Sequence, residues 1–139
     1  MATILIVEDE KSIIALLTRV LSQAGHVVTS AANGAEGILK IQREAPDLVI
    51  MDMSMPRLNG WDATRLLKAS PATRHIPILA LTSAITAEDR MEAYRAGCDA
   101  YETKPIDLKR LVTRVADLTR NVASRDERQQ RASDFKALH

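Results

Sequence analysis

The chain has 139 residues, of which 46% are hydrophobic and 27% charged, with a formal net charge of +1 at pH 7. These values are typical of one soluble globular domain and predict neither direct DNA binding nor membrane attachment, which need a concentrated basic patch. No hydrophobic run approaches the roughly 18 residues of a membrane-spanning helix, and the N-terminus lacks a signal-peptide pattern. Cys98 is the only cysteine, so we expect no internal disulfide and a cytoplasmic location.

Five short apolar or β-branched runs alternate with segments of helical periodicity along the first 120 residues. Such runs predict buried strands, and apolar residues spaced three or four apart predict helices that cover a sheet. The predicted strands are Thr3–Val7, Val27–Ala31, Leu48–Asp52, Ile78–Thr82 and Ala100–Thr103. The predicted helices cover residues 11–24, Ala35–Glu44, Asn59–Lys68, a segment ending at Ala96 and a segment beginning after Asp107. Because a helix follows every strand, the repeated crossovers require a parallel (βα)5 sheet.

Turn and capping residues mark several of the helix ends. Gly25 and Gly97 follow predicted helices and supply the left-handed position that commonly ends a helix. Thr86 and Asp89 resemble a capping box at the start of the fourth helix. Asp107 is expected to cap the fifth helix. These signals separate the elements of a single domain over residues 1–120.

Strand polarity predicts the order of the strands in the sheet. The first, third and fourth strands are uniformly apolar, as central strands covered on both faces should be. The second and fifth carry polar side chains that suit the edges of a sheet, namely Thr29, Ser30, Glu102 and Thr103. The order 2-1-3-4-5 satisfies both observations and corresponds to a doubly wound, flavodoxin-like α/β fold. Its topological switch point, where ligands bind, then lies between strands 1 and 3.

Residues 121–139 differ in character from the rest of the chain. Charged residues are frequent and apolar ones few, so this tail is expected to extend the last helix or to be disordered. Ala132, Phe135 and Leu138 recur at three-residue spacing, which leaves a short docking helix as an alternative. A segment this short does not form an independent domain.

Three acidic residues fall at the ends of the first and third strands. Asp52 leaves a buried strand several residues before the next helix begins, so it is a poor candidate for that helix's N-cap. A carboxylate in this place is a candidate nucleophile that forms an aspartyl phosphate. Glu8 and Asp9, taken alone, are acids favoured by a helix N-terminus. Beside Asp52 they would repel one another unless a cation binds.

A hard divalent cation suits these ligands. Mg²⁺ takes a few carboxylates together with water and phosphoryl oxygens, and Mn²⁺ suits the same donors. The backbone carbonyl of Ser54, two residues after Asp52, is a further candidate ligand. The sequence therefore predicts a site for Mg²⁺, or Mn²⁺, at the switch point.

Hydroxyl and lysine side chains follow the fourth and fifth strands. Thr82 and Ser83 end the fourth strand, where a hydroxyl can donate a hydrogen bond to a phosphoryl oxygen. Lys104 follows the fifth strand and would neutralise phosphate charge as a point cation. The Lys104-Pro105 bond is a candidate cis peptide. Tyr101, an aromatic residue in an edge strand, has simple packing as its alternative role.

The motifs resemble the receiver domain of two-component response regulators, of the single-domain chemotaxis type. The resemblance covers about residues 2–120, with every motif in order. It rests on Ile6-Val7-Glu8-Asp9-Glu10, Ile50-Met51-Asp52-Met53-Ser54-Met55-Pro56-Arg57-Leu58-Asn59-Gly60, Ala80-Leu81-Thr82-Ser83-Ala84 and Tyr101-Glu102-Thr103-Lys104-Pro105.

The resemblance implies a phosphorylation switch. It makes Asp52 the phosphoacceptor, with Mg²⁺ held by Glu8, Asp9, Asp52 and the Ser54 carbonyl. It also implies that Lys104, Thr82 and Ser83 contact the phosphoryl group, and that Thr82 and Tyr101 form a switch pair. The implied partners are a histidine kinase or phosphotransfer protein as donor and a downstream protein that binds the face of the fourth helix, fifth strand and fifth helix.

Other classes of function remain as alternatives at this point. The chain is expected to act without an output domain, and to catalyse only its own phosphorylation and dephosphorylation; the family also implies a homodimer as one assembly. A hydrolase would share the carboxylate nucleophile, but the short loops offer no separate substrate pocket. A phosphorylation-independent adaptor is disfavoured by the complete set of site residues. A flavin-binding module of the same topology is disfavoured by the scarcity of aromatic residues.

Overall fold

Five parallel strands form the centre of the structure, a computed structural model that describes residues 1–53, 59–83 and 86–120. The strands pair in the order β2-β1-β3-β4-β5, so the predicted doubly wound α/β fold is confirmed. The strands are β1 (Thr3–Val7), β2 (Val27–Ala31), β3 (Leu48–Asp52), β4 (Ile78–Thr82) and β5 (Ala100–Thr103). The helices are α1 (Lys11–Gln23), α2 (Gly34–Glu44), α3 (Gly60–Ala69), α4 (Ala87–Ala96) and α5 (Leu108–Thr119). The tail at 121–139 lies outside the described residues.

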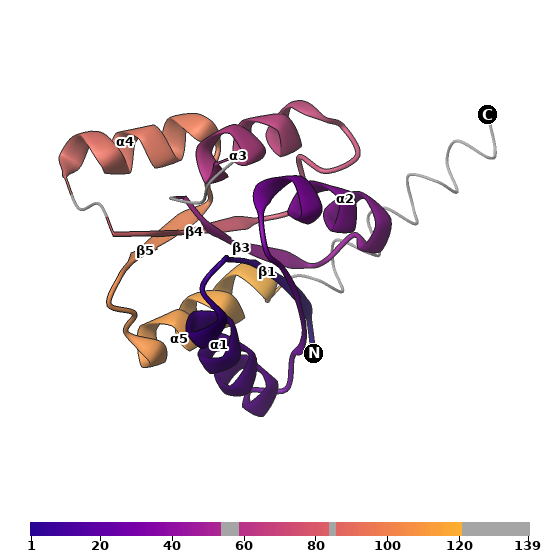
Figure 1. Cartoon of the computed structure of the whole chain (residues 1–139), viewed down its shortest axis with the longest axis vertical. Coiled ribbons are helices and arrows are strands. Elements are labelled where there is room, and N and C mark those ends of the chain that lie inside the picture. Colours follow the sequence, from indigo (N-terminus) through magenta and orange to yellow (C-terminus); the bar gives the residue numbers. More distant parts are fainter. Residues whose placement is uncertain (54–58, 84–85, 121–139) are drawn as a thin grey trace.

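Helices cover both faces of this sheet. Figure 1 shows α1 and α5 on one face and α2, α3 and α4 on the other. Every residue of β3 and β4 is buried, as their uniformly apolar sequences predict. No helix in the ranges that the structure describes is long and apolar enough to cross a membrane.

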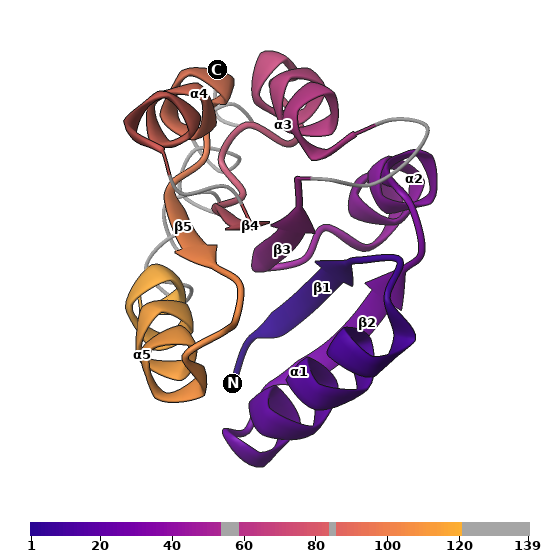
Figure 2. The same ribbon diagram turned by 60° about the vertical axis from the view of Figure 1, so that its left-hand side comes forward.

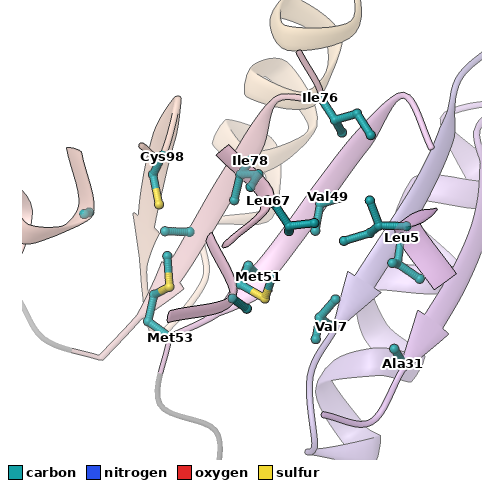
Figure 3. Packing of buried hydrophobic residues seen from close by; sticks show 14 residues of the cluster. Leu5, Val7, Ala31, Val49, Met51, Met53, Leu67, Ile76, Ile78 and Cys98 are labelled. Carbon is teal, nitrogen blue, oxygen red and sulfur yellow. The ribbon is translucent and has the colours of Figure 1, made fainter. Parts of the chain in front are cut away.

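Two apolar clusters hold the helices against the sheet. On the side of α2, α3 and α4, one cluster includes Met51 and Met53 of the β3 region and Leu67 of α3 (Figure 3). On the other side, Leu17 and Leu21 of α1 pack with residues of β1, β3 and α5. Each large apolar side chain buried in this way stabilises the fold by about 1.5–3 kcal/mol. The two clusters therefore fix the strand ends that carry the candidate site.

Asparagine and aspartate side chains decide where three helices begin. Asn33 accepts a hydrogen bond from the backbone N–H of Glu36, and Asn59 accepts one from Asp62, so α2 and α3 begin at glycines one residue away from the predicted starts. The predicted cap of α5 is confirmed, because Asp107 Oδ1 accepts from the backbone N–H of Arg110 at 3.1 Å.

The predicted helix stops are also observed. Gly25 and Gly97 adopt φ values of +94° and +106°, which non-glycine residues rarely adopt. At the start of α4 the backbone N–H of Arg90 donates to the Thr86 carbonyl at 3.2 Å. The capping box itself cannot be compared, because the Asp89 side chain lies outside what the structure describes.

Glu102 is a buried acid in an edge strand. Its polarity predicted that β5 lies at the edge of the sheet, which is confirmed, and the structure adds that the residue is only 2% exposed. Its side chain lies on the α5 side of the sheet, in contact with Arg110 and Arg114. Tyr101, its neighbour in the strand, packs on the opposite face against the cluster below α4. Two arginines from α5 compensate the buried carboxylate.

Candidate functional site

The C-terminal ends of the strands bring the predicted acidic residues together. Asp52 ends β3, and Glu8 and Asp9 directly follow β1. In the parallel register Val7 lies beside Met51, so residues 8 and 52 follow at neighbouring positions. One carboxylate oxygen from each of Glu8, Asp9 and Asp52 lies within 4.8 Å of the other two. The strand order therefore produces the cluster that the sequence predicted at the switch point.

Two of these carboxylates are removed from solvent. Glu8 is fully buried and Asp52 is 3% exposed, whereas Asp9 is exposed. The Oε1 atom of Glu8 accepts a hydrogen bond from the backbone N–H of Glu10 at 3.2 Å. Its Oε2 atom is buried and has no hydrogen-bond partner in the described part of the chain. The arrangement thus places unequal carboxylates side by side, one at the surface and two beneath it.

Lys104 supplies a positive charge to both buried acids. Its Nζ atom lies 3.4 Å from Glu8 Oε2 and 3.6 Å from Asp52 Oδ2. Burial lowers the pKa of Lys104, but the charges of Asp52 and Glu8 outweigh this effect and raise its pKa above the usual value. The lysine therefore stays protonated. The peptide bond between Lys104 and Pro105, the candidate singled out from the sequence, is cis.

Glu8 is the acid whose proton affinity the site changes most. Burial, followed by the charge of Asp52, raises the pKa of Glu8 from 4.5 to about 7. The backbone hydrogen bond from Glu10 and the charge of Lys104 act in the opposite direction and are weaker. A single ammonium group is therefore insufficient to keep the buried pair of carboxylates fully ionised near neutral pH.

The donors in this cluster fit a hard divalent cation. Three carboxylates face one ammonium group, so negative charge is in excess when all are ionised. The buried Glu8 Oε2 atom has only the ion pair with Lys104 at 3.4 Å and no well-directed hydrogen bond among the described residues, so a second cation would stabilise it further. Oxygen-only donors of this kind suit Mg²⁺ or Mn²⁺. The predicted carbonyl ligand at Ser54 lies outside the described residues.

A glycine holds the segment after Asp52 close to the strand. A Cβ atom at Gly60 would lie 2.4 Å from the Asp52 carbonyl oxygen and 2.7 Å from the Cα atom of Met53. No side chain fits against backbone at these distances, so only glycine allows α3 to begin this close to the end of β3. Sequence reasoning missed this role, although the Asn59-Gly60 pair was a visible signal of a helix start.

Thr82 and Tyr101 occupy different depths of the same region. Thr82 ends β4, is 4% exposed and accepts a backbone hydrogen bond from the N–H of Lys104 at 2.9 Å. Ser83 follows it and is exposed. Tyr101 lies further back in β5, half-buried, with its ring centroid 5.9 Å from that of Tyr94 in an edge-to-face contact. The guanidinium carbon of Arg90 lies 5.7 Å from the Tyr101 ring centroid.

Comparison with known proteins identifies the family of this chain. The family model described as the response regulator receiver domain matches residues 4–116. The chain belongs to the response regulator receiver domain family. Protein PilH of Pseudomonas aeruginosa is 40% identical over 112 residues, which cover 81% of this chain and 93% of PilH.

The same receiver domain also occurs within longer relatives. Response regulator PleD of Caulobacter vibrioides is 35% identical over 137 residues, but this chain covers only 30% of PleD. Among solved structures, the receiver domain of sensor histidine kinase PA1611 from Pseudomonas aeruginosa PAO1 has a TM-score of 0.78 and 30% identity, covering 85% of this chain and 97% of that one. That structure is described with a magnesium ion coordinated in its active site cleft.

Proposed function

We propose that this receiver domain accepts a phosphoryl group on Asp52 from the phosphohistidine of a kinase or phosphotransfer protein. The observation that carries the proposal is the acidic cluster with its one lysine: Lys104 Nζ lies within 3.6 Å of an oxygen on each of the two buried carboxylates. A buried nucleophilic carboxylate beside a fixed cation is suited to receiving a dianionic group. Membership of the receiver family supports the same reaction.

The transfer needs little covalent chemistry from the protein. An Asp52 carboxylate oxygen attacks the phosphorus, a new O–P bond forms and the P–N bond to the donor imidazole breaks, with its electron pair remaining on the nitrogen. Carboxylate oxygens are weak nucleophiles, so alignment and charge neutralisation supply most of the rate enhancement. Hydrolysis of the aspartyl phosphate by water returns the domain to its starting state. The domain then catalyses only its own phosphorylation and dephosphorylation.

The residues around Asp52 have separate roles in the transfer. Lys104 offsets charge on the phosphoryl oxygens, and the Thr82 hydroxyl, with Ser83 beside it, donates to them. Glu8, Asp9 and Asp52, with the predicted carbonyl of Ser54, hold Mg²⁺, which when bound neutralises the charge that develops on the phosphoryl oxygens. Gly60 keeps the strand end and its nucleophile in place. Each role uses a side chain or backbone atom at one edge of the sheet.

The signal leaves the site through Thr82 and Tyr101. Movement of Thr82 towards the phosphoryl group vacates space below α4, and Tyr101, now half-buried against Tyr94 and Arg90, moves into it. The surface of α4, β5 and α5 changes as a result and binds a downstream protein. The proposed setting is the cytoplasm, where histidine kinases expose their donor domains.

Covalent labelling with acetyl phosphate and Mg²⁺, followed by intact-mass spectrometry, tests the proposal. Wild type should gain one phosphoryl group and Asp52→Asn none. Asp117→Asn, which makes the same change on an exposed residue of α5, should label as wild type does. Labelling of Asp52→Asn at wild-type stoichiometry would refute the assignment. Multiple turnover of a phosphate ester by wild type would instead indicate a hydrolase.

A further inference from the structure

A second buried carboxylate lies on the far side of β5 from Tyr101, away from the phosphorylation site. Glu102 is 2% exposed. Arg110 Nε donates a hydrogen bond to Glu102 Oε2 at 3.1 Å, whereas Arg114 Nε forms an ion pair with Glu102 Oε1 that lacks hydrogen-bond geometry. Both arginines come from one face of α5, one helical turn apart, so a single strand residue anchors both.

The contacts with Glu102 leave part of each arginine available to a ligand. They engage the Nε atoms, whereas a guanidinium group also carries four N–H donors on its two Nη atoms. The side chains of Arg110 and Arg114 are 55% and 41% exposed, so these outer edges reach solvent. Because Glu102 already holds the guanidinium groups in position, less conformational entropy is lost when they bind a planar anion.

A pocket of about 350 Å³ opens over this cluster. Its lining consists of Arg90, Tyr101, Glu102, Thr103, Arg110 and Arg114. Side chains alternate between the two faces of a strand, so a pocket lined by three consecutive residues of β5 lies along the strand's outer edge. Figure 2 shows α4 and α5 flanking β5 at this edge of the sheet. Among the described residues no strand pairs with that edge.

The charge of the pocket is opposite to that of the phosphorylation site. Three arginines line it and one carboxylate lies beneath, so positive charge is in excess. The Arg90 guanidinium lies over the Tyr101 ring, which also holds it in place on the α4 side. The pocket therefore offers guanidinium groups from two helices across one open strand edge.

We propose that this pocket binds an acidic, extended peptide segment of a partner protein, with its carboxylates received by Arg110, Arg114 and Arg90. Arg–carboxylate pairs with two parallel N–H···O bonds combine strength with geometric selectivity. A segment that lies along β5 also reaches the outward backbone N–H and C=O groups of the strand, with which no described strand pairs, as in strand-addition complexes. The proposal names the partner chemistry for the face that phosphorylation is proposed to alter, so its place in signalling rests on the proposed function.

Charge and shape favour a peptide over a nucleic acid. The formal net charge of the whole chain is +1, so the pocket is a local positive patch rather than part of a broad basic surface. Nucleic-acid binding depends on neutralising several phosphates along a backbone. A pocket along one short strand with three arginines suits a few carboxylates instead.

Selection from a random dodecapeptide display library, with the unphosphorylated full chain as bait, tests the proposal. Peptides selected by wild type should be enriched in Asp and Glu several-fold over the input library. Removing the arginines alone would leave Glu102 buried without a partner, so the variants compared are Glu102→Leu and Glu102→Leu/Arg110→Gln/Arg114→Gln. The first should still enrich acidic peptides, but more weakly than wild type because Glu102 no longer positions the guanidinium groups. The second should lose the enrichment, with peptide affinity at least about tenfold below that of the first.

A matched control separates the pocket from general charge. Arg95→Gln/Lys109→Gln removes two positive charges from exposed positions on the same two helices, outside the pocket, and should keep the enrichment. No acidic enrichment with wild type, or equal enrichment in the triple variant, would overturn the proposal. So would tighter, arginine-dependent binding of a single-stranded oligonucleotide, or self-association that needs the same arginines. Acetyl phosphate labelling of each variant reports separately on Asp52, so failure of one proposal is distinguishable from failure of the other.

Discussion

The protein buries carboxylates at two places, and the surroundings give the two places opposite character. At the ends of β1 and β3, Glu8 and Asp52 are buried beside each other with one ammonium group from Lys104. At β5, Glu102 is buried alone with two guanidinium groups from α5. The first cluster has excess negative charge and the second excess positive charge, although both rest on buried acids.

The difference shows that burial alone does not define the role of an acid. A buried carboxylate with too few cations has a raised pKa and favours a metal ion, as Glu8 does. A buried carboxylate with more cations than it needs positions them for another anion, as we propose for Glu102. Five predictions test this contrast.

The largest expected effect is the pH dependence of the metal-free protein. The pKa of Glu8 is raised from 4.5 to about 7 in the folded state, so the folded protein binds the Glu8 proton more tightly than the unfolded chain does. The free energy of unfolding therefore falls as the pH rises from about 4.5 to about 7. Full ionisation costs on the order of 3 kcal/mol. We therefore expect wild type, but not Glu8→Gln, to lose most of that free energy of unfolding between pH 5 and pH 8. Urea unfolding of both proteins in EDTA at the two pH values measures this difference.

Mg²⁺ should offset the loss of stability that ionisation of Glu8 causes at high pH. Because proton and metal compete for Glu8, saturating Mg²⁺ should raise wild-type stability more at pH 8 than at pH 5. Equal stabilisation at both pH values, or a pH response that Glu8→Gln leaves unchanged, would contradict the charge imbalance described for this cluster.

Loss of the arginines should have the next largest effect. Arg110→Met/Arg114→Met leaves Glu102 buried without a cation and should lower the free energy of unfolding by about 2 kcal/mol. This loss is smaller than that expected on breaking a fully buried ion pair, because each arginine is half-exposed. Adding Glu102→Leu should restore most of the loss in urea unfolding. If the double variant were as stable as wild type, the arginines would not be compensating the buried charge.

Isosteric neutralisation of one acid should change stability in opposite directions at the two places. Asp52→Asn removes repulsion between neighbouring carboxylates and should stabilise the metal-free protein at pH 8 by about 1 kcal/mol. Glu102→Gln weakens two charge-assisted contacts and should destabilise it by about 1 kcal/mol. The two variants should therefore move to opposite sides of wild type in urea unfolding. A shift in the same direction for both would show that the clusters are alike.

The smallest effect should come from the arginine that rests on an aromatic ring. Arg90→Gln removes the cation over Tyr101 and should cost about 0.5 kcal/mol, whereas Arg90→Lys should retain part of the interaction. Thermal unfolding of the two variants measures the difference. A loss as large as that of the α5 double variant would mean that Arg90 compensates Glu102 as well.

Most of the fold was predictable because its signals are local. All five strands have the predicted bounds, since continuous apolar runs mark β1, β3 and β4, and β-branched or aromatic residues mark the more polar β2 and β5. Starts of α2 and α3 differ from the prediction by one residue, because the side chains of Asn33 and Asn59 decide the first helical residue. The cluster of Glu8, Asp9 and Asp52 followed from the predicted strand order.

The sequence by itself determined the order of the elements, the edge at which the acidic residues meet and the lysine that accompanies them. Only the tertiary structure decided how these charges are compensated. The polarity of Glu102 predicted an edge strand, but it carries no information about Arg110 and Arg114, which reach Glu102 from another element. Strand and helix patterns depend on neighbours in the chain, whereas the pKa of a buried acid depends on the charges that folding brings beside it.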